Sequence, residues 1–357
     1  MAKIPLPALL KAMVDQDASD LHITVGTPPQ FRIGGKMVKV KIDPLNAQDT
    51  KELCYSVLTD SQKSDFETAL ELDFSFGVKD VARFRGNIFY QKGAVGAVFR
   101  RIPITIPTFE QLGLPAVLKE IIKRPNGLIL VTGPTGSGKS TTLAALLDVL
   151  NLTDPGHIMT IEDPIEFIHP HKMCVVNQRE VGTDTKTFGD ALKRVLRQDP
   201  DFILVGELRD IETIEMALTM AETGHLVFAT LHTNSAVQSL YRVINVFPPH
   251  QQTQIRQLLA FVLQAIVCQQ LIPKSSGGGR CMAMEILLPN NAIRNLIRED
   301  KMHQVYSSMQ AGQNDSGMMT MNQSLLRLVQ AGALNKSDAI DISGVPDELT
   351  KMLQQVK

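Results

Sequence analysis

The stretch that decides the fold reads Gly127-Leu-Ile-Leu-Val-Thr132 followed directly by Gly133-Pro-Thr-Gly-Ser-Gly-Lys-Ser140. Its second half fits the pattern G-x-x-x-x-G-K-[ST] at every fixed position. Leucines then repeat at the spacing of one helix face, at Leu143, Leu146, Leu147 and Leu150. An apolar strand, a glycine-rich loop and a helix in this order predict an α/β nucleotide-binding domain rather than a plain glycine-rich turn.

The residue types in this loop suit the binding of a triphosphate. Glycines let backbone N–H groups turn inward around a phosphate, and the helix N-terminus adds a partial positive charge. We expect Lys139 to bridge the β- and γ-phosphates and the Ser140 hydroxyl to hold Mg²⁺, so the expected cofactors are ATP and Mg²⁺. The expected nucleotide-binding residues are Gly133, Pro134, Thr135, Gly136, Ser137, Gly138, Lys139, Ser140 and Thr141.

A carboxylate near this loop is expected at the end of the apolar segment Asp201-Phe-Ile-Leu-Val-Gly-Glu207. Ligands of open α/β sheets lie at the C-terminal edge of the strands, where Glu207 stands. The aspartate usual in such a segment is missing, and Gly206 precedes the glutamate. We predict that Glu207 orients Mg²⁺, directly or through water. The alternative is a surface acid beside Arg209.

A further acidic cluster, Ile161-Glu-Asp-Pro-Ile-Glu166, follows another predicted strand. A carboxylate there can orient the water that attacks the γ-phosphate or accept its proton. Glu162 is closest to the strand end, so we favour it over Glu166. For Asp163, capping a turn ahead of Pro164 is an equally good interpretation.

Two histidines flank the predicted strand Leu226–Leu231. His225 and His232 are seven residues apart, so an extended strand places them at opposite ends and on opposite faces, which does not suit one shared metal. His232 stands at the C-terminal end, where it can sense the γ-phosphate by a hydrogen bond. A purely structural role is the alternative.

Arginines occur in pairs, and most surface arginines are simply solvated. Charge builds on the γ-phosphate oxygens during transfer, however, and a guanidinium from a neighbouring subunit stabilises it. A strand containing Arg83-Phe84-Arg85 places Arg83 and Arg85 on one face. They are therefore our first choice for contacts across a subunit interface. The other pairs are Arg100 with Arg101 and Arg194 with Arg197.

The chain divides into two predicted domains. Residues 1–100 read as a mixed α/β domain and 113–357 as the ATPase domain, which becomes helical from about residue 290. Two prolines in Arg101–Pro107 favour extended backbone, so 101–112 is the predicted linker. Alternating apolar strands and amphipathic helices from about residue 125 predict a parallel sheet covered by helices.

The elements expected in the first domain are the helices Leu6–Val14, Thr50–Leu58 and Ser61–Ala69 and strands at Asp20–Val25, Phe74–Phe76, Arg83–Arg85 and Ala97–Arg100. In the second, the expected strands are Gly127–Thr132, Ile158–Ile161, Phe202–Gly206, Leu226–Leu231 and Ala283–Leu288. A Gly/Asn/Ser loop is expected at 312–317 among the last helices.

Composition indicates an ordinary globular protein. The 357 residues are 44% hydrophobic and 20% charged, with a net charge of −1, no tryptophan and 5% aromatic residues, so we expect no binding to nucleic acid. No apolar run is long enough to cross a membrane, and no signal peptide is evident, so the expected location is the cytoplasm. The four cysteines lack metal spacing and are expected to be buried thiols.

Motifs along nearly the whole chain resemble the type IV pilus retraction ATPases, the PilT family, within the secretion and pilus-assembly ATPases. They are the loop at 133–140, Ala18-Ser-Asp-Leu-His22, Ala82-Arg-Phe-Arg85, Thr160-Ile-Glu-Asp-Pro-Ile-Glu166, Asp199-Pro-Asp-Phe-Ile-Leu-Val-Gly-Glu-Leu-Arg-Asp210, Ala221-Glu-Thr-Gly-His-Leu-Val-Phe-Ala-Thr-Leu-His-Thr233 and Ala292-Ile-Arg-Asn-Leu-Ile-Arg-Glu299. The last motif is the one that separates retraction members from assembly members.

This resemblance implies a PAS-like N-terminal domain followed by a RecA-like motor domain, assembled as a homohexamer. Nucleotide would bind between the domains, with arginines from the N-terminal domain reaching the phosphates. Glu162, Glu207, His225 and His232 fall on functional positions of the family, in which a glycine at the place of Gly206 is normal. The partner implied is an inner-membrane platform protein of the pilus machinery, which would hold the motor peripherally at that membrane.

Three other functions remain open at this point. The first is a pilus-assembly or type II secretion ATPase, a class whose members are longer chains that often carry a four-cysteine insert. A RecA-like nucleic-acid motor would need a basic groove or stacking platform. A nucleotide-binding scaffold without turnover would keep the loop, and an unchanged rate of ATP hydrolysis in Lys139→Ala or Glu207→Ala would favour it.

Overall fold

The computed structural model describes residues 4–79, 81–102, 105–311 and 317–355, and the expected loop at 312–317 lies almost wholly outside them. Two compact units make up the fold. The first comprises Met1–Thr105 together with Glu166–Ile168, and the second Ile106–Ile165 and His169–Lys357. Both are mixed α/β, which confirms the predicted fold class.

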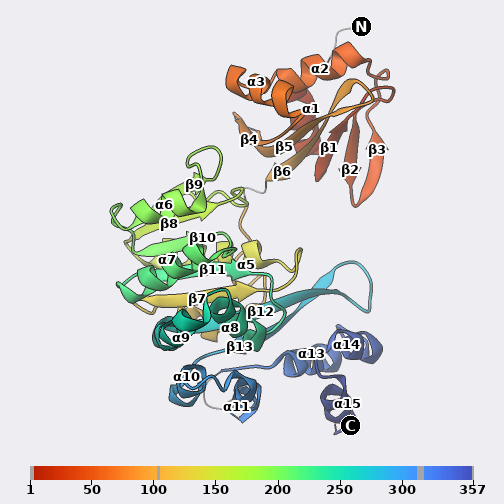
Figure 1. Cartoon of the computed structure of the whole chain (residues 1–357). Coiled ribbons are helices and arrows are strands. Elements are labelled where there is room, and N and C mark those ends of the chain that lie inside the picture. Colours follow the sequence, from red (N-terminus) through yellow and green to blue (C-terminus); the bar gives the residue numbers. More distant parts are fainter. Residues whose placement is uncertain (1–3, 80, 103–104, 312–316, 356–357) are drawn as a thin grey trace. The chain divides into compact units, whose positions relative to one another are not determined.

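The first unit is an antiparallel sheet packed against helices (Figure 1). Its strands are β1 (Asp20–Ile23), β2 (Gln30–Ile33), β3 (Lys36–Lys39), β4 (Glu71–Val78), β5 (Ala82–Gln91) and β6 (Ala94–Ile102), in the order β3-β2-β1-β6-β5-β4. Its helices are α1 (Leu6–Asp15), α2 (Ala47–Tyr55) and α3 (Asp60–Ala69). The helix expected at Thr50–Leu58 was misplaced. A capping box between Asn46 and Asp49 starts it earlier.

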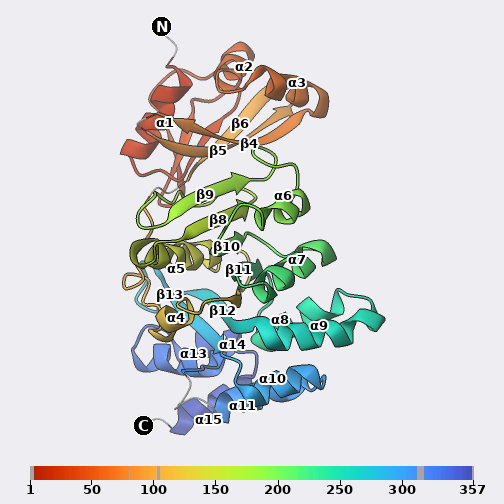
Figure 2. The same cartoon turned by 90° about the vertical axis from the view of Figure 1, so that its left-hand side faces the viewer.

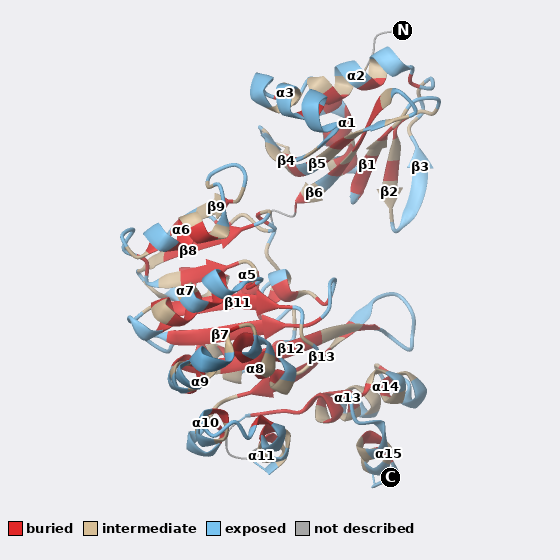
Figure 3. Ribbon diagram, viewed as in Figure 1, coloured by how far each residue is buried: buried red, intermediate tan, exposed pale blue. Residues whose placement is uncertain are grey.

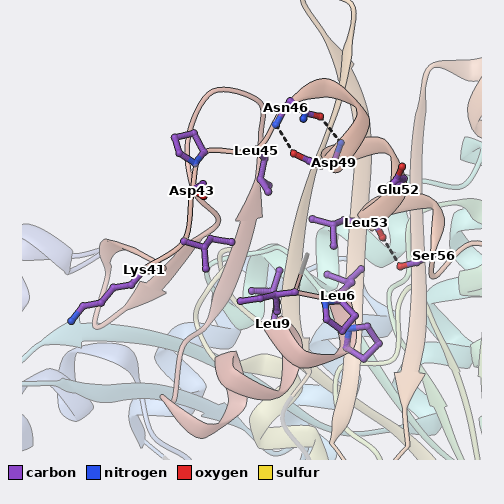
Figure 4. A pocket seen from close by; sticks show the side chains of 15 residues that line it. Leu6, Leu9, Lys41, Asp43, Leu45, Asn46, Asp49, Glu52, Leu53 and Ser56 are labelled. Atoms are coloured by element: carbon purple, nitrogen blue, oxygen red, sulfur yellow. Dashed lines mark hydrogen bonds between the residues drawn. The ribbon is translucent and has the colours of Figure 1, made fainter. Parts of the chain in front are cut away.

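This unit contains a cavity of about 1000 Å³ between the start of α1, the loop before α2, and α2 itself. Figure 4 shows its apolar side chains, among them Leu6, Leu9, Leu45 and Leu53, beside the polar groups of the α2 cap. None of the predicted catalytic residues lines it.

The second unit is built on a seven-stranded sheet in the order β13-β12-β7-β11-β10-β8-β9. The strands are β7 (Gly127–Thr132), β8 (His157–Glu162), β9 (Val175–Glu180), β10 (Phe202–Val205), β11 (Leu226–Leu231), β12 (Leu263–Pro273) and β13 (Arg280–Leu287). The helices are α4 (Val117–Ile121), α5 (Lys139–Thr153), α6 (Phe188–Val195), α7 (Ile211–Glu222), α8 (Ala236–Asn245) and α9 (Pro249–Val262).

Both faces of this sheet are covered, with α4 and α5 on one side and α7 to α9 on the other (Figure 2). Successive residues of β7 therefore enter different cores: Leu128 and Leu130 pack into one cluster, Ile129 and Val131 into the other. Figure 3 shows the central strands buried throughout. Burial on both faces explains why these strands read as continuous apolar runs.

The prediction of a parallel sheet was wrong at one edge. The strand expected at Ala283–Leu288 is β13, which pairs antiparallel with β12. The sequence interpretation missed β12 because it follows α9 without an intervening turn, and it missed β9 at the other edge. β12 itself pairs parallel with β7 and so reaches the glycine-rich loop.

The chain ends in a set of short helices, as predicted. They are α10 (Asn291–Arg298), the 3₁₀ turn η1 (Met302–Gln304), α11 (Val305–Ala311), α13 (Met321–Gln330), α14 (Lys336–Ile342) and α15 (Pro346–Gln355). A core around Leu325, Ala339 and Leu349 joins the last three to the β12–β13 hairpin. All four cysteines are free and buried, as expected.

Candidate functional site

Four neighbouring strands bring the predicted site residues to one edge of the sheet. β7, β11, β10 and β8 are mutually parallel, with Thr132 opposite Leu231, and Val205 opposite both Ala229 and Ile161. The residues after these strand ends therefore share the C-terminal edge, the ligand-binding edge of such sheets. They are the glycine-rich loop, His232, Glu207 and Glu162.

The loop between β7 and α5 has a backbone that other residues could not adopt. A Cβ atom on Gly133 would lie 2.2 Å from the carbonyl oxygen of Gln269, and its φ is +137°. Gly136 and Gly138 have φ values of +80° and +87°, in the left-handed region that favours glycine. The three glycines thus bend the chain at the start of α5.

This loop fits a polyphosphate. Within the described part of the chain, no hydrogen bond engages the amides of Gly136, Gly138 or Ser140, all of which precede or begin α5. The buried hydroxyl of Ser137 also has no partner among the described residues. Such a set of free donors at a helix N-terminus is what a phosphate binds.

Lys139 lies folded into this loop. Its Nζ donates to the carbonyl oxygens of Gly133 at 2.7 Å and Pro134 at 3.2 Å. Burial lowers the pKa of Lys139 because the charged amine loses hydration, while the negative charge of Glu207 acts in the opposite direction. A phosphate here would give the ammonium group a charged partner in place of two carbonyls.

Gln269 supports the loop from β12, and sequence reasoning missed it. The side chain is fully buried, and its Nε2 donates to the carbonyl oxygen of Ser137 at 2.7 Å. A glutamine that is buried in a strand is a signal, since a buried amide requires a partner. That signal was hidden because β12 itself was not predicted.

Glu207 lies at the end of β10 and links two groups. Its Oε1 is 3.2 Å from Nε2 of His232, and its Oε2 accepts a 2.9 Å hydrogen bond from Nε of Arg209. The Glu207 side chain is 22% exposed and that of His232 48%, so both remain accessible to solvent. The contact with Arg209, which the surface-acid alternative predicted, is present. Glu207 nevertheless lies at the C-terminal edge of the sheet, together with the phosphate loop and His232.

A close approach of neighbouring backbone explains why glycine, at Gly206, precedes Glu207. A Cβ atom at Gly206 would approach the Cα atom of Glu162 and the carbonyl oxygen of Ile161 to 3.2 Å each. Its amide donates to that same carbonyl at 2.8 Å, which draws β10 and β8 together. Any side chain at 206 would be tight against this backbone, which favours glycine there.

Glu162 is a buried carboxylate at the end of β8. Its Oε1 accepts hydrogen bonds from the Thr160 hydroxyl at 2.7 Å and from Nε2 of Gln178 at 3.2 Å. Only 8% of the residue is exposed. These contacts hold the carboxylate in one orientation, as a group that positions a water molecule requires. Asp163 and Glu166 are both exposed, and Glu166 belongs with the first unit.

Three predicted residues are not brought to this edge within the second unit. His225 precedes β11, at the opposite edge, where its Nδ1 lies 3.1 Å from the carbonyl oxygen of Met220. Arg83 and Arg85 are in β5 of the first unit. The Nη2 of Arg83 donates to the Ser75 hydroxyl, and Arg85 is exposed. Their participation stays a prediction.

The described residues contain no group of three or more His, Cys, Asp or Glu side chains suited to a metal ion. Ser140 and Glu207 alone would leave most positions around Mg²⁺ to phosphate oxygens and water, as is usual for this ion. Together, the largely parallel sheet, the loop after β7 and the neighbouring carboxylates define a P-loop nucleoside triphosphatase.

Comparisons with known proteins extend this result. The model of the family "Type II/IV secretion system protein" matches residues 98–335. The type IV pilus retraction ATPase PilT of Pseudomonas aeruginosa is 51% identical over 339 residues, which cover 95% of this chain and 98% of that protein. A twitching motility protein of Neisseria gonorrhoeae is 48% identical, covering 92% of this chain and 87% of its own.

A solved structure agrees over the whole length. The crystal structure of the pilus retraction motor PilT with bound ADP has a TM-score of 0.93 at 51% identity, covering 98% of this chain and all of its own. The chain belongs to the type II/IV secretion system protein family and, within it, to the PilT family of ATPases.

Proposed function

We propose that this protein is a hexameric motor that hydrolyses ATP to drive type IV pilus retraction, and with it twitching motility. The observation that carries the proposal is the meeting of the phosphate loop, Glu162, Glu207 and His232 at one sheet edge. The end-to-end likeness to a retraction ATPase supports the direction of the motor.

Each site residue has a distinct role in this mechanism. Lys139 and the loop amides bind the phosphates, and Ser140 and Glu207 would hold Mg²⁺, directly or through water. The ion would neutralise charge on the transferred phosphate. Glu162, fixed by its two hydrogen bonds, orients the attacking water and accepts its proton. His232 senses the γ-phosphate and passes its state to Glu207, 3.2 Å away.

Arg83 and Arg85 are proposed to reach the phosphates of a neighbouring subunit in a ring of six. The support is that Arg85 is exposed on β5 and that guanidinium groups stabilise the charge of phosphoryl transfer. Rings that mix Arg85→Ala with Lys139→Ala subunits should then recover part of the activity that each variant alone has lost. No recovery at any mixing ratio would contradict the assignment.

The proposed location is the cytoplasm, peripherally at the inner membrane through a platform protein of the pilus machinery. No helix in the described part of the chain has the length and apolar character needed to span a bilayer. Attachment through a partner is consistent with that observation.

The experiment that tests the function is deletion of the gene, followed by counting of surface pili and imaging of their shortening. Cells with many pili that never shorten support retraction, and cells without pili would support assembly instead. A Lys139→Ala allele should behave as the deletion does. An exposed-lysine variant, Lys123→Ala, serves as the control and should restore retraction.

A further inference from the structure

A buried polar contact joins the phosphate loop to the neighbouring hairpin. Thr132, the last residue of β7, donates from Oγ1 to the Sγ atom of Cys268 in β12 at 2.9 Å. Neither residue is accessible to solvent. Cys268 stands opposite Glu285 in the ladder between β12 and β13, so polar groups continue from the loop into the hairpin.

A second contact starts from the segment that carries His232. Its neighbour Thr233 has its hydroxyl 2.6 Å from the hydroxyl of Ser239 in α8. Ser239 in turn donates to the carbonyl oxygen of Ser235, the residue that caps α8, at 2.8 Å. The His232 segment and the first turns of α8 are therefore one hydrogen-bonded unit.

Glu285 is the point where this unit meets the C-terminal helices. Its Oε1 accepts a 2.6 Å hydrogen bond from the amide of Ala236, and its Oε2 accepts a 3.4 Å bond from the amide of Met321. These are the first residues of α8 and α13, respectively. One carboxylate, 3% exposed, thus holds the N-termini of two helices that are 85 residues apart in sequence.

The usual caps of both helices are already engaged elsewhere. Ser235 accepts from the third amide of α8, and Thr320 accepts from the third amide of α13. Glu285 therefore supplies what neither cap can, an acceptor for the first amide of each helix. The positive end of both helix dipoles favours a negative charge here.

Burial alone would favour an apolar side chain rather than a carboxylate at position 285. Burial raises the pKa of Glu285, because its charged form loses hydration, while the amides of Ala236 and Met321 act against that rise. An apolar side chain would avoid the loss of hydration but would leave both amides without an acceptor. The contact to two helices is what distinguishes glutamate at this position.

We propose that Glu285 is a positioning residue for ATP turnover, which ties the His232 segment to helix α13 so that the C-terminal helices follow the state of the nucleotide site. It acts through α8 and does not touch the nucleotide. The inference rests on the proposed function, in which His232 senses the γ-phosphate.

Glu285→Gln tests the shared contact with little change of shape. The amide oxygen can still accept from one helix, but the NH₂ group meets the other as donor against donor. We expect kcat for ATP to fall about fivefold to tenfold, with KM unchanged within about twofold. An unchanged kcat would overturn the proposal, as would a fall that merely matches the loss of folded protein.

A pair of substitutions at Met321 cuts the link without altering the carboxylate. Proline fits the first position of a helix, and Thr320 has the extended backbone that proline requires of its predecessor, with φ −80° and ψ 159°. Met321→Pro and Met321→Ala both lose the side chain, but only proline lacks the N–H. We expect Met321→Pro to reproduce the fall in kcat and Met321→Ala to keep the rate of the unmodified protein. Equal rates in the two variants would contradict the proposal, even if Glu285→Gln does not fold.

Hydrogen exchange at the start of α13 distinguishes coupling to the nucleotide site from a purely structural role of Glu285. In the unmodified protein, exchange at the start of α13 should differ between the ADP complex and the complex with a non-hydrolysable ATP analogue. In Glu285→Gln and Met321→Pro that difference should vanish. Its persistence in both variants would overturn the coupling.

A His232→Ala variant separates the two hypotheses. If it hydrolyses ATP at the unmodified rate, the proposed role of His232 fails. If it is slow while Glu285→Gln and Met321→Pro are both fast, the role of His232 stands and the coupling through Glu285 is wrong.

Discussion

The two ends of strand β11 carry the same residue type in different surroundings. His232 at the C-terminal end faces the Glu207 carboxylate at 3.2 Å and remains half exposed beside the phosphate loop. His225 at the other end lies near the carbonyl oxygen of Met220, and its own carbonyl accepts from the amide of Gly127. One histidine has a charged, accessible neighbour, whereas the other is held by backbone groups.

The difference shows that the edge of the sheet at which a polar residue lies decides whether it can contact a ligand. Parallel strands gather their C-terminal loops at one edge, so acids and histidines that follow them converge on a ligand. Groups at the opposite edge contact the backbone and nearby uncharged side chains. His157 has its Nδ1 atom 3.0 Å from the carbonyl oxygen of Asp199 and its Nε2 atom 2.8 Å from Nδ2 of Asn177.

The largest expected effect separates two acids of the same cluster. Glu162→Gln should lower kcat for ATP about 100-fold, because the carboxylate that orients water is lost, while the shape of the side chain is kept. Glu166→Gln, four residues away and exposed, should remain within about twofold of the unmodified rate. Steady-state phosphate release measures both. Similar rates in the two variants would remove Glu162 from the mechanism.

A smaller effect tests the comparison along β11 directly. His232→Ala should lower kcat about tenfold, since its hydrogen bond acts through Glu207 rather than on the reacting water. His225→Ala in the isolated subunit should leave nucleotide binding unchanged and shift only the thermal midpoint. Steady-state phosphate release measures the first variant, and binding of a fluorescent ADP analogue together with a melting curve measures the second. A loss of nucleotide affinity in His225→Ala would show that the opposite edge matters to the site.

An effect on stability rather than on turnover concerns His169, another histidine in the second unit. Burial lowers its pKa to about 4, with Asp148 opposing this shift and Lys172 adding to it, and its Nδ1 has no partner among the described residues. The unfolded chain therefore binds more protons than the folded one between pH 6.5 and 4, so the contribution present above pH 6.5 is lost as the pH falls. The change is at most about 3 kcal/mol.

Urea unfolding of this protein at pH 7 and pH 5 measures that loss. A His169→Phe variant is the control and should have a smaller pH dependence over the same range. If the two proteins respond equally to pH, other groups account for the change.

The candidate site could be predicted closely because its residues follow strands that are apolar on both faces. The G-x-x-x-x-G-K-S loop, Glu162, Glu207 and His232 each stand directly after such a run, and the parallel arrangement brings them together. The antiparallel hairpin could not be predicted in the same way. β12 follows α9 without a turn signal, and with it Gln269, the support of the loop, was missed.

By itself, the sequence determined the nucleotide-binding loop, the α/β class and the acids at strand ends, since each depends on local pattern and residue type. Tertiary structure alone decided which of those groups meet. The register of β8, β10 and β11 brings His232 and Glu207 to one edge and explains Gly206 by the approach of Glu162. The position of β13 places Glu285 between two distant helices. Such facts depend on distances between segments remote in sequence, which no local pattern contains.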